Sequence, residues 1–222
     1  MYFLPIWFQA VKGVDAEKSG IMSLPNIGSV TVFSMIAAAV TQIEGHYSPW
    51  IILSSVLMAV GGGLLTTLKV NSGHAQWLGY QFLFGIGSGF GFQGPVIAVQ
   101  TVLGIQDIAS GVVIVYFAQS LFGALMVSVG QDVLTNELLK NLEIQLPFMD
   151  PRVVTEAGAS GFRSSVSAAD LPKVLLAYNA AVTKVFYIPV ALACASLLGA
   201  LIIEWKSVKG KKAELEDVRA DL

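Results

Sequence analysis

Five long stretches of this sequence are almost free of charge, and they constrain the fold more than any other feature. None has an Asp, Glu, Lys or Arg near its middle, and they run approximately over 23–42, 50–68, 77–100, 108–130 and 178–204. A helix needs about 20 mostly apolar residues to cross the roughly 30 Å hydrocarbon layer of a bilayer. Only 13% of the 222 residues are charged, against about 25% in a soluble domain. The sequence therefore predicts an all-α polytopic membrane protein with five complete transmembrane helices.

The first dozen residues are apolar but too short to span a bilayer. "MYFLPIWFQAVKG" turns polar at Lys12, and at about 1.5 Å per residue it covers about half of the hydrocarbon layer. It lacks the basic region and cleavage site of a signal peptide, and it lacks the polar face of an interfacial anchor. We expect residues 1–12 to be the end of a truncated transmembrane helix, followed by four transmembrane helices within 13–130.

The stretch "FGIGSGFGFQGP", which begins at residue 84, raises the possibility of a phosphate-binding loop. A dinucleotide fingerprint needs a third glycine at the sixth place, but Phe90 and Phe92 stand there. No Lys-Ser or Lys-Thr pair follows the stretch, so it is not a P-loop either. A nucleotide site is therefore excluded.

Within a membrane helix the same glycines have a packing role. They form two small-residue pairs on nearly opposite faces, and small residues allow the close backbone contact that holds membrane helices together. Pro95 removes a backbone hydrogen bond and should kink the helix near Gly91. We predict that helix packing and a hinge depend on Gly85, Gly87, Gly89, Gly91 and Pro95.

A polar region, 131–177, separates the fourth and fifth apolar stretches. Leu134, Leu138 and Leu142 recur at four-residue spacing, which predicts an amphipathic helix lying along the membrane surface. "SAAD" at 167–170 resembles a capping box for a second short helix leading into the last span. The tail, 205–222, is basic and then acidic, and its dense lysines favour a cytoplasmic C-terminus.

Catalytic and metal-binding clusters are absent from the sequence. Cys194 is the only cysteine, His46 and His74 stand in separate polar connections, and the acidic residues lie in loops, at span edges or in the tail. The net charge of −2 gives no basis for a nucleic-acid partner. We expect no enzyme activity, no catalytic residue, no metal and no cofactor.

The deepest polar side chains of the spans are Gln93 and Gln119. Burying an unpaired amide costs about 2–7 kcal/mol, so each should face protein or a watery cavity. One alternative is that they bond each other. The other is that they line a substrate path beside Phe90, Tyr116 and Phe122, a mixture suited to a bulky, weakly polar molecule.

Taken together, these stretches resemble the C-terminal part of the fourteen-helix drug:proton antiporters of the major facilitator superfamily, and most closely the fungal efflux pumps for toxins and drugs. The resemblance is carried in order along nearly the whole chain by "YFLPIWFQAVKGVDAEKSGIMSLP" (2–25), "GIGSGFGFQGPVIAVQT" (85–101), "SVGQDVLTNEL" (128–138), "LLAYNAAVTKVFYIPVALA" (175–193) and "EWKSVKGKK" (204–212). In such transporters two six-helix domains, each a three-plus-three repeat, rock about a central site.

The resemblance implies where each segment belongs. Residues 1–12 would end the first helix of the second domain, and the five spans would be most of the rest of that domain. The region 131–177 would face outward and the tail inward. Because the first and fourth helices of a domain usually line the path, Tyr2, Phe3 and the helix over 77–100 would lie beside it. The expected substrate-path residues are Gln9, Trp7, Phe90, Gln93, Tyr116, Gln119 and Phe122.

Two departures from the family pattern shape the expected function. The first six-helix domain, which usually carries proton coupling, is absent, and "TQIEGHYSPW" (41–50) lacks the basic signature of that loop. We expect part of a proton-coupled efflux transporter for amphipathic organic compounds, incomplete and inactive alone, in the plasma membrane or the vacuole. Its partners would be the lipid bilayer, a small amphipathic solute and protons taken up through the missing domain. The alternative is a non-transporting remnant or scaffold that associates through the glycine-rich faces.

Overall fold

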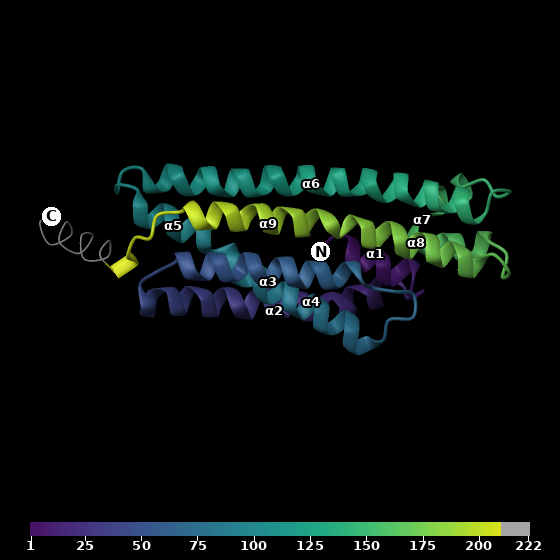
Figure 1. The fold of residues 1–222 in the computed structure, drawn as a ribbon, viewed down its shortest axis with the longest axis horizontal. Coiled ribbons are helices and arrows are strands. Elements are labelled where there is room, and N and C mark those ends of the chain that lie inside the picture. Colours follow the sequence, from purple (N-terminus) through teal and green to yellow (C-terminus); the bar gives the residue numbers. More distant parts are fainter. Residues whose placement is uncertain (210–222) are drawn as a thin grey trace, which may run out of the picture.

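The computed structural model describes residues 1–209, which form an elongated bundle of helices (Figure 1). Within that range no strand occurs beyond one isolated bridge between His46 and Ser207, so the all-α prediction is confirmed. The helices are α1 (Phe3–Ala10), α2 (Ala16–Glu44), α3 (Ser48–Thr66), α4 (His74–Phe92), α5 (Gly94–Val102), α6 (Ile108–Gln145), α7 (Arg152–Ser165), α8 (Leu171–Val185) and α9 (Tyr187–Ile202).

Five helical segments of the described chain are long and apolar enough to cross a membrane. They are Ala16–Glu44, Ser48–Thr66, His74–Val102, Ile108–Gln145 and Leu171–Ile202. Each contains most or all of one predicted stretch, so the prediction of a polytopic membrane protein is confirmed. The basic residues Lys211, Lys212 and Arg219, which entered the prediction of a cytoplasmic tail, lie outside the described residues.

Two of the five segments are interrupted, and each interruption lies two or three residues before a proline. The α4 and α5 helices meet at Gln93, and α8 and α9 meet at Phe186. Proline has no backbone N–H, so Pro95 and Pro189 cannot make the helical bond to the residue four places earlier. The break at Gln93 lies two residues before Pro95, close to where the sequence predicts a kink.

The region after Gly130 differs from the expectation. Residues 131–145 do not form a separate surface helix but continue α6, which is 38 residues long. Leu134, Leu138 and Leu142 are buried in the cluster that includes α1 and α8. No proline or helix-ending residue stops α6 at the membrane boundary, and the leucine stripe finds its apolar partner on α8 rather than in lipid.

The motif "SAAD" forms a hydrogen-bonded turn directly before a helix that belongs to the last span itself. The Ser167 hydroxyl accepts a hydrogen bond from the backbone N–H of Asp170 at 3.2 Å and donates to its carboxylate at 2.8 Å. The helix that follows is α8, so the last helical segment begins at Leu171 rather than at 178. Between Arg152 and Ser165 lies a further helix, α7, which the sequence patterns do not predict.

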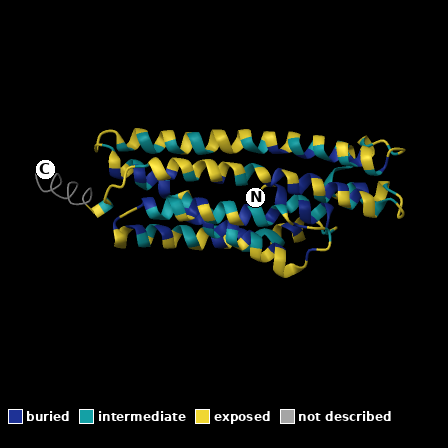
Figure 2. Cartoon of the chain, viewed as in Figure 1, coloured by how far each residue is buried: buried dark blue, intermediate teal, exposed yellow. Residues whose placement is uncertain are grey.

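Burial is concentrated at one end of the bundle. Figure 2 shows buried residues gathered around α1 and α8, whereas most of α6 is exposed along its length. The core includes Trp7, Phe8, Leu142, Phe162 and Val182, all fully buried. None of the most apolar window of α6 is buried. This helix therefore offers its membrane-depth surface to lipid or to another protein segment.

Candidate functional site

The α4 helix lies between α2 and α3, and its glycines face both of them. A Cβ added at Gly89 would lie 2.8 Å from the backbone oxygen of Val30 in α2, and one at Gly87 would lie 2.6 Å from the backbone nitrogen of Met58 in α3. The first glycine face (Gly85 and Gly89) is covered by α2, and the second glycine face (Gly87 and Gly91) by α3. Real side chains do not fit at such distances, so backbone contact requires glycine here.

A third close contact comes from α3 and was not anticipated. A Cβ at Gly61 would lie 2.6 Å from the backbone nitrogen of Phe84 in α4. The signal was present in the run of three glycines at 61–63. The sequence could not tell which of the three faces α4, because that depends on the rotation of α3 about its axis.

Polar groups between these helices are paired across the contacts. The Asn26 amide donates to the backbone oxygen of Gln81 at 2.9 Å, and the Gln81 amide donates to that of Met22 at 3.0 Å. The Ser54 hydroxyl donates to the backbone oxygen of Gly87 at 2.7 Å. These three donors add interhelical bonds to the close packing, although the buried side-chain oxygen of Gln81 has no partner within the described chain.

Three of the expected substrate-path residues pack within the bundle. Trp7 is fully buried and its indole N–H donates to the Asn179 side chain at 2.8 Å. Phe90 is buried and stacks on Trp50 with ring centroids 5.4 Å apart. Gln9 is half-buried and donates to the Ser19 hydroxyl at 3.1 Å.

The other four lie on the exposed side or between helices. Tyr116 and Phe122 project from α6 and are exposed. Gln93 and Gln119 are half-buried, and no hydrogen bond joins their side chains within residues 1–209. The structure therefore does not bring the seven residues to one surface, and it does not favour the alternative in which the two amides bond each other.

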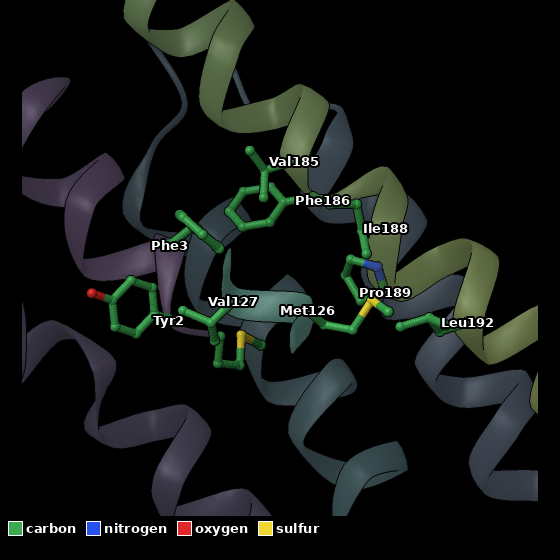
Figure 3. A pocket seen from close by; sticks show the side chains of 10 residues that line it. Tyr2, Phe3, Met126, Val127, Val185, Phe186, Ile188, Pro189 and Leu192 are labelled. Atoms are coloured by element: carbon green, nitrogen blue, oxygen red, sulfur yellow. The ribbon is translucent and has the colours of Figure 1, made fainter. Parts of the chain in front are cut away.

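An apolar pocket opens where the chain begins (Figure 3). Tyr2 and Phe3 face Met126 and Val127 of α6 across it, and the junction of α8 and α9 forms its third wall. The cavity measures about 130 Å³, and the only hydrogen-bonding side chain in its lining is the Tyr2 hydroxyl. It can take an apolar group of a small molecule. Sequence reasoning placed Tyr2 and Phe3 beside the path but missed Met126, Pro189 and Leu192.

Two cations hold the end of α1 at the buried end of the bundle. Arg163 of α7 donates to the backbone oxygens of Ala10 and Val11 at 2.9 and 3.1 Å. Lys12 donates to the backbone oxygens of Val70 and Ser72, both at 2.7 Å, and burial lowers the pKa of its ammonium group. Positive charge beside the last carbonyls of a helix is favourable. These contacts fix the direction of α1 and hence the wall of the pocket.

At the other end, the segment after α9 pairs with the connection between α2 and α3. The Tyr47 hydroxyl donates to the backbone oxygen of Glu204, and the Val208 N–H donates to that of Gly45 at 2.8 Å. Gly45 has a φ of +85°, which glycine adopts without strain. Tyr47 is almost fully buried, and burial raises the pKa of its hydroxyl.

The chain is similar to several curated fungal proteins. It is 46% identical over 211 residues to "MFS-type transporter astH" of Aspergillus oryzae, covering 95% of this chain and 37% of that protein. It is 45% identical to "Efflux pump roqT" of Penicillium rubens, covering 94% and 39%, and 46% identical to "MFS-type efflux pump MFS1" of Trichophyton rubrum, covering 96% and 40%. The chain thus spans about two fifths of the length of these relatives.

Other comparisons give no match: no family model matches the chain, and no solved structure does. Within residues 1–209 no group of three or more His, Cys, Asp or Glu side chains lies together in a way that could hold a metal ion.

Proposed function

We propose that this chain, which is similar to fungal transporters and efflux pumps of the major facilitator superfamily, forms the C-terminal part of a pump that exports amphipathic organic compounds in exchange for protons. The observation that carries the proposal is its 45–46% identity to fungal proteins named as transporters and efflux pumps. Five membrane-crossing segments make it an integral membrane protein, and we propose the plasma membrane as its site.

The geometry supports a role in a moving transporter. Two faces of α4 are formed by glycines and pack closely against α2 and α3. The helix break at Gln93 separates this packed helix from α5. In our proposal α5 pivots at this break while α4 stays packed between α2 and α3. The pocket beside Tyr2 and Phe3 receives the apolar part of the solute. The described spans hold no acidic side chain near their middle, so the proposal assigns proton coupling to a first six-helix domain.

The alternative of a scaffold that associates through the glycine faces is less well supported. Both glycine faces of α4 are covered by helices of the same chain. A Cβ added at Gly85, Gly87 or Gly89 would lie within 3.0 Å of a backbone atom of α2 or α3. A second copy could reach these glycines only by displacing α2 or α3.

The size of the native protein in membranes tests the proposal first. An antibody against "SVKGKKAELEDVRADL" (207–222) should detect a band of more than twice the 23.6 kDa of this chain. Cells that contain the band should export a neutral fluorescent amphiphile, and a protonophore should stop the export. A single band near 23.6 kDa, or export that is insensitive to the protonophore, would contradict the proposal.

A further inference from the structure

A second cavity lies between α3, the break of α4 and α5, and α9. Its volume is about 450 Å³, within the range of small-molecule sites. We call it the kink cavity, because Pro95 and Pro189, the prolines beside the two helix breaks, both line it. Pro189 and Leu192 also line the pocket of Figure 3, so the start of α9 separates the two spaces.

The kink cavity lies at membrane depth. At about 1.5 Å per residue, Ser55 lies about 10 Å along α3 from its start and Ser196 about 9 Å before the end of α9. These two helix ends are at the same end of the bundle, because Tyr47 and Ser48 hydrogen-bond the backbone of Glu204. The cavity therefore lies at the depth of the hydrocarbon layer.

The lining excludes a charged ligand. None of the residues around the kink cavity is Lys, Arg, His, Asp or Glu. A phosphate or ammonium group held there would be desolvated without a partner of opposite charge, which is costly at this depth. The occupant is therefore uncharged and mainly hydrophobic.

Serine hydroxyls give the cavity a specific polar contact. The Ser55 and Ser196 oxygens are 2.8 Å apart, and each hydroxyl also lies within hydrogen-bond distance of a carbonyl of its own helix. Each serine has one hydrogen and two lone pairs. With both hydrogens engaged, the oxygens of this pair are left to accept a hydrogen bond, so a ligand that binds the pair must donate one. Ser88, also in the lining, makes no side-chain hydrogen bond within the described chain.

We propose that the kink cavity binds an uncharged hydrophobic molecule that carries a hydroxyl group. Two sources share this chemistry: a membrane sterol and a neutral amphiphilic solute. A molecule in the cavity touches the walls at both helix breaks, so it holds α5 and α9 at their present bends. Binding does not depend on transport, and its test therefore stands apart from that of the proposed function.

Photolabelling of the 222-residue chain in phosphatidylcholine vesicles tests this site. Three probes carry the same diazirine and alkyne groups: a sterol, a neutral hydroxylated aromatic amphiphile, and a phosphatidylcholine labelled in its acyl chain. We expect one of the two hydroxylated probes to label peptides of α3, α5 and α9, and we expect an excess of the same alcohol without the diazirine to reduce that labelling. The probe that labels these peptides shows whether the ligand is a sterol or an amphiphilic solute. Equal labelling of these peptides by the phosphatidylcholine probe would overturn the proposal.

A variant pair tests the position. Ser196→Phe fills the cavity, and Ser120→Phe makes the same change at an exposed serine of α6 outside it. Ser196→Phe should lower the labelling of α3 and α9 at least fivefold, and Ser120→Phe should leave it unchanged. Equal labelling in both variants would show that the probe binds elsewhere.

The wild-type chain gives a test that requires no substitution. The methyl ether of the bound alcohol has the same hydrophobic body but cannot donate a hydrogen bond. It should compete at least fivefold more weakly than the alcohol. Equal competition would remove the role of the serine oxygens and with it the proposed specificity.

Discussion

At the scale of single residues, the glycines of α4 differ in what surrounds them. Gly89 faces α2, where an added Cβ would meet the Val30 oxygen at 2.8 Å and the Phe33 Cβ at 2.9 Å. Gly79, in the same helix, has no atom within 4 Å of the corresponding position. Glycine inside a helix is unfavourable by up to about 1 kcal/mol relative to alanine unless contact requires it.

Gly89→Ala should therefore destabilise the bundle by about 1–3 kcal/mol, because α2 and α4 must separate to admit the methyl group. Gly79→Ala, the matched control, should leave stability unchanged or raise it slightly. Thermal unfolding of the detergent-solubilised chain followed by circular dichroism measures both. If the two variants unfold at the same temperature, close packing at Gly89 is not what holds α4.

Tyr47 gives a residue-level prediction that depends on pH. Its buried hydroxyl donates to the backbone of Glu204, and burial raises its pKa above the ordinary value of about 10. The folded state therefore holds this proton more tightly than the unfolded state. The resulting stability is fully present below the unfolded pKa and is lost as pH rises through the folded pKa.

Tyr47→Phe should cost about 1 kcal/mol near neutral pH, because one hydrogen bond is lost. The difference from the wild type should shrink above about pH 10, because phenylalanine has no proton to lose. Unfolding midpoints of both chains from pH 7 to 11 give the comparison. If the wild type and Tyr47→Phe differ by the same amount at every pH in this range, the Tyr47 hydroxyl does not have a raised pKa in the folded state.

At the scale of elements, two prolines in membrane helices have different outcomes. α2 continues through Pro25, whereas the helix containing Pro95 is interrupted at Gln93. Near Pro95 the Ser54 hydroxyl binds the Gly87 carbonyl and crowds Gly91, so α3 contacts the helix at the break itself. Proline removes one hydrogen bond in either case, and the surrounding packing decides whether the helix bends.

Pro95→Ala should straighten the segment, since alanine restores the N–H that can bond to the Gly91 carbonyl. Spin labels at the exposed positions Leu78 and Val102 would report the change in a Cys194→Ser background, as a shift of several ångströms in their distance. Pro25→Ala with labels at Ile21 and Ile43 is the control and should show no shift. An unchanged distance after Pro95→Ala would mean that packing alone sets the bend.

At the scale of the whole molecule, α7 connects the region between the last two spans to the start of the chain. Phe162 is fully buried and stacks on Tyr178 with ring centroids 5.1 Å apart, and the neighbouring Arg163 holds the end of α1. α7 therefore joins α8 to α1, and through α1 it supports the pocket of Figure 3.

Arg163→Gln should loosen α1 by removing its contact with the Ala10 and Val11 carbonyls. Amide hydrogen exchange of residues 3–14 should become several-fold faster, because helix-end opening is no longer restrained. Arg152→Gln, an exposed arginine at the start of α7, is the matched control. Equal exchange in both variants would show that Arg163 does not restrain the end of α1.

The sequence by itself determined the membrane class and the number of spans. Length and hydropathy decide whether a helix can cross a bilayer, and both are local properties that need no knowledge of neighbours. The spacing of Gly85, Gly87, Gly89 and Gly91 is likewise local, and it identified two smooth faces of one helix. The spacing of the leucines at 134–142 is also local, and it correctly predicted a helix. It did not show that this helix is continuous with α6.

The tertiary structure alone decided which faces meet. Trp7 pairs with Asn179, and Asn26 pairs with Gln81, while Gln93 and Gln119 do not pair within the described chain. Each outcome depends on the rotation of a helix about its axis, which sequence spacing leaves undetermined. The kink cavity is of this kind, because it exists only where α9, from a distant part of the chain, packs beside α3 and the break between α4 and α5. Sequence determines what one helix can do, and the packing of several helices determines where a ligand can lie.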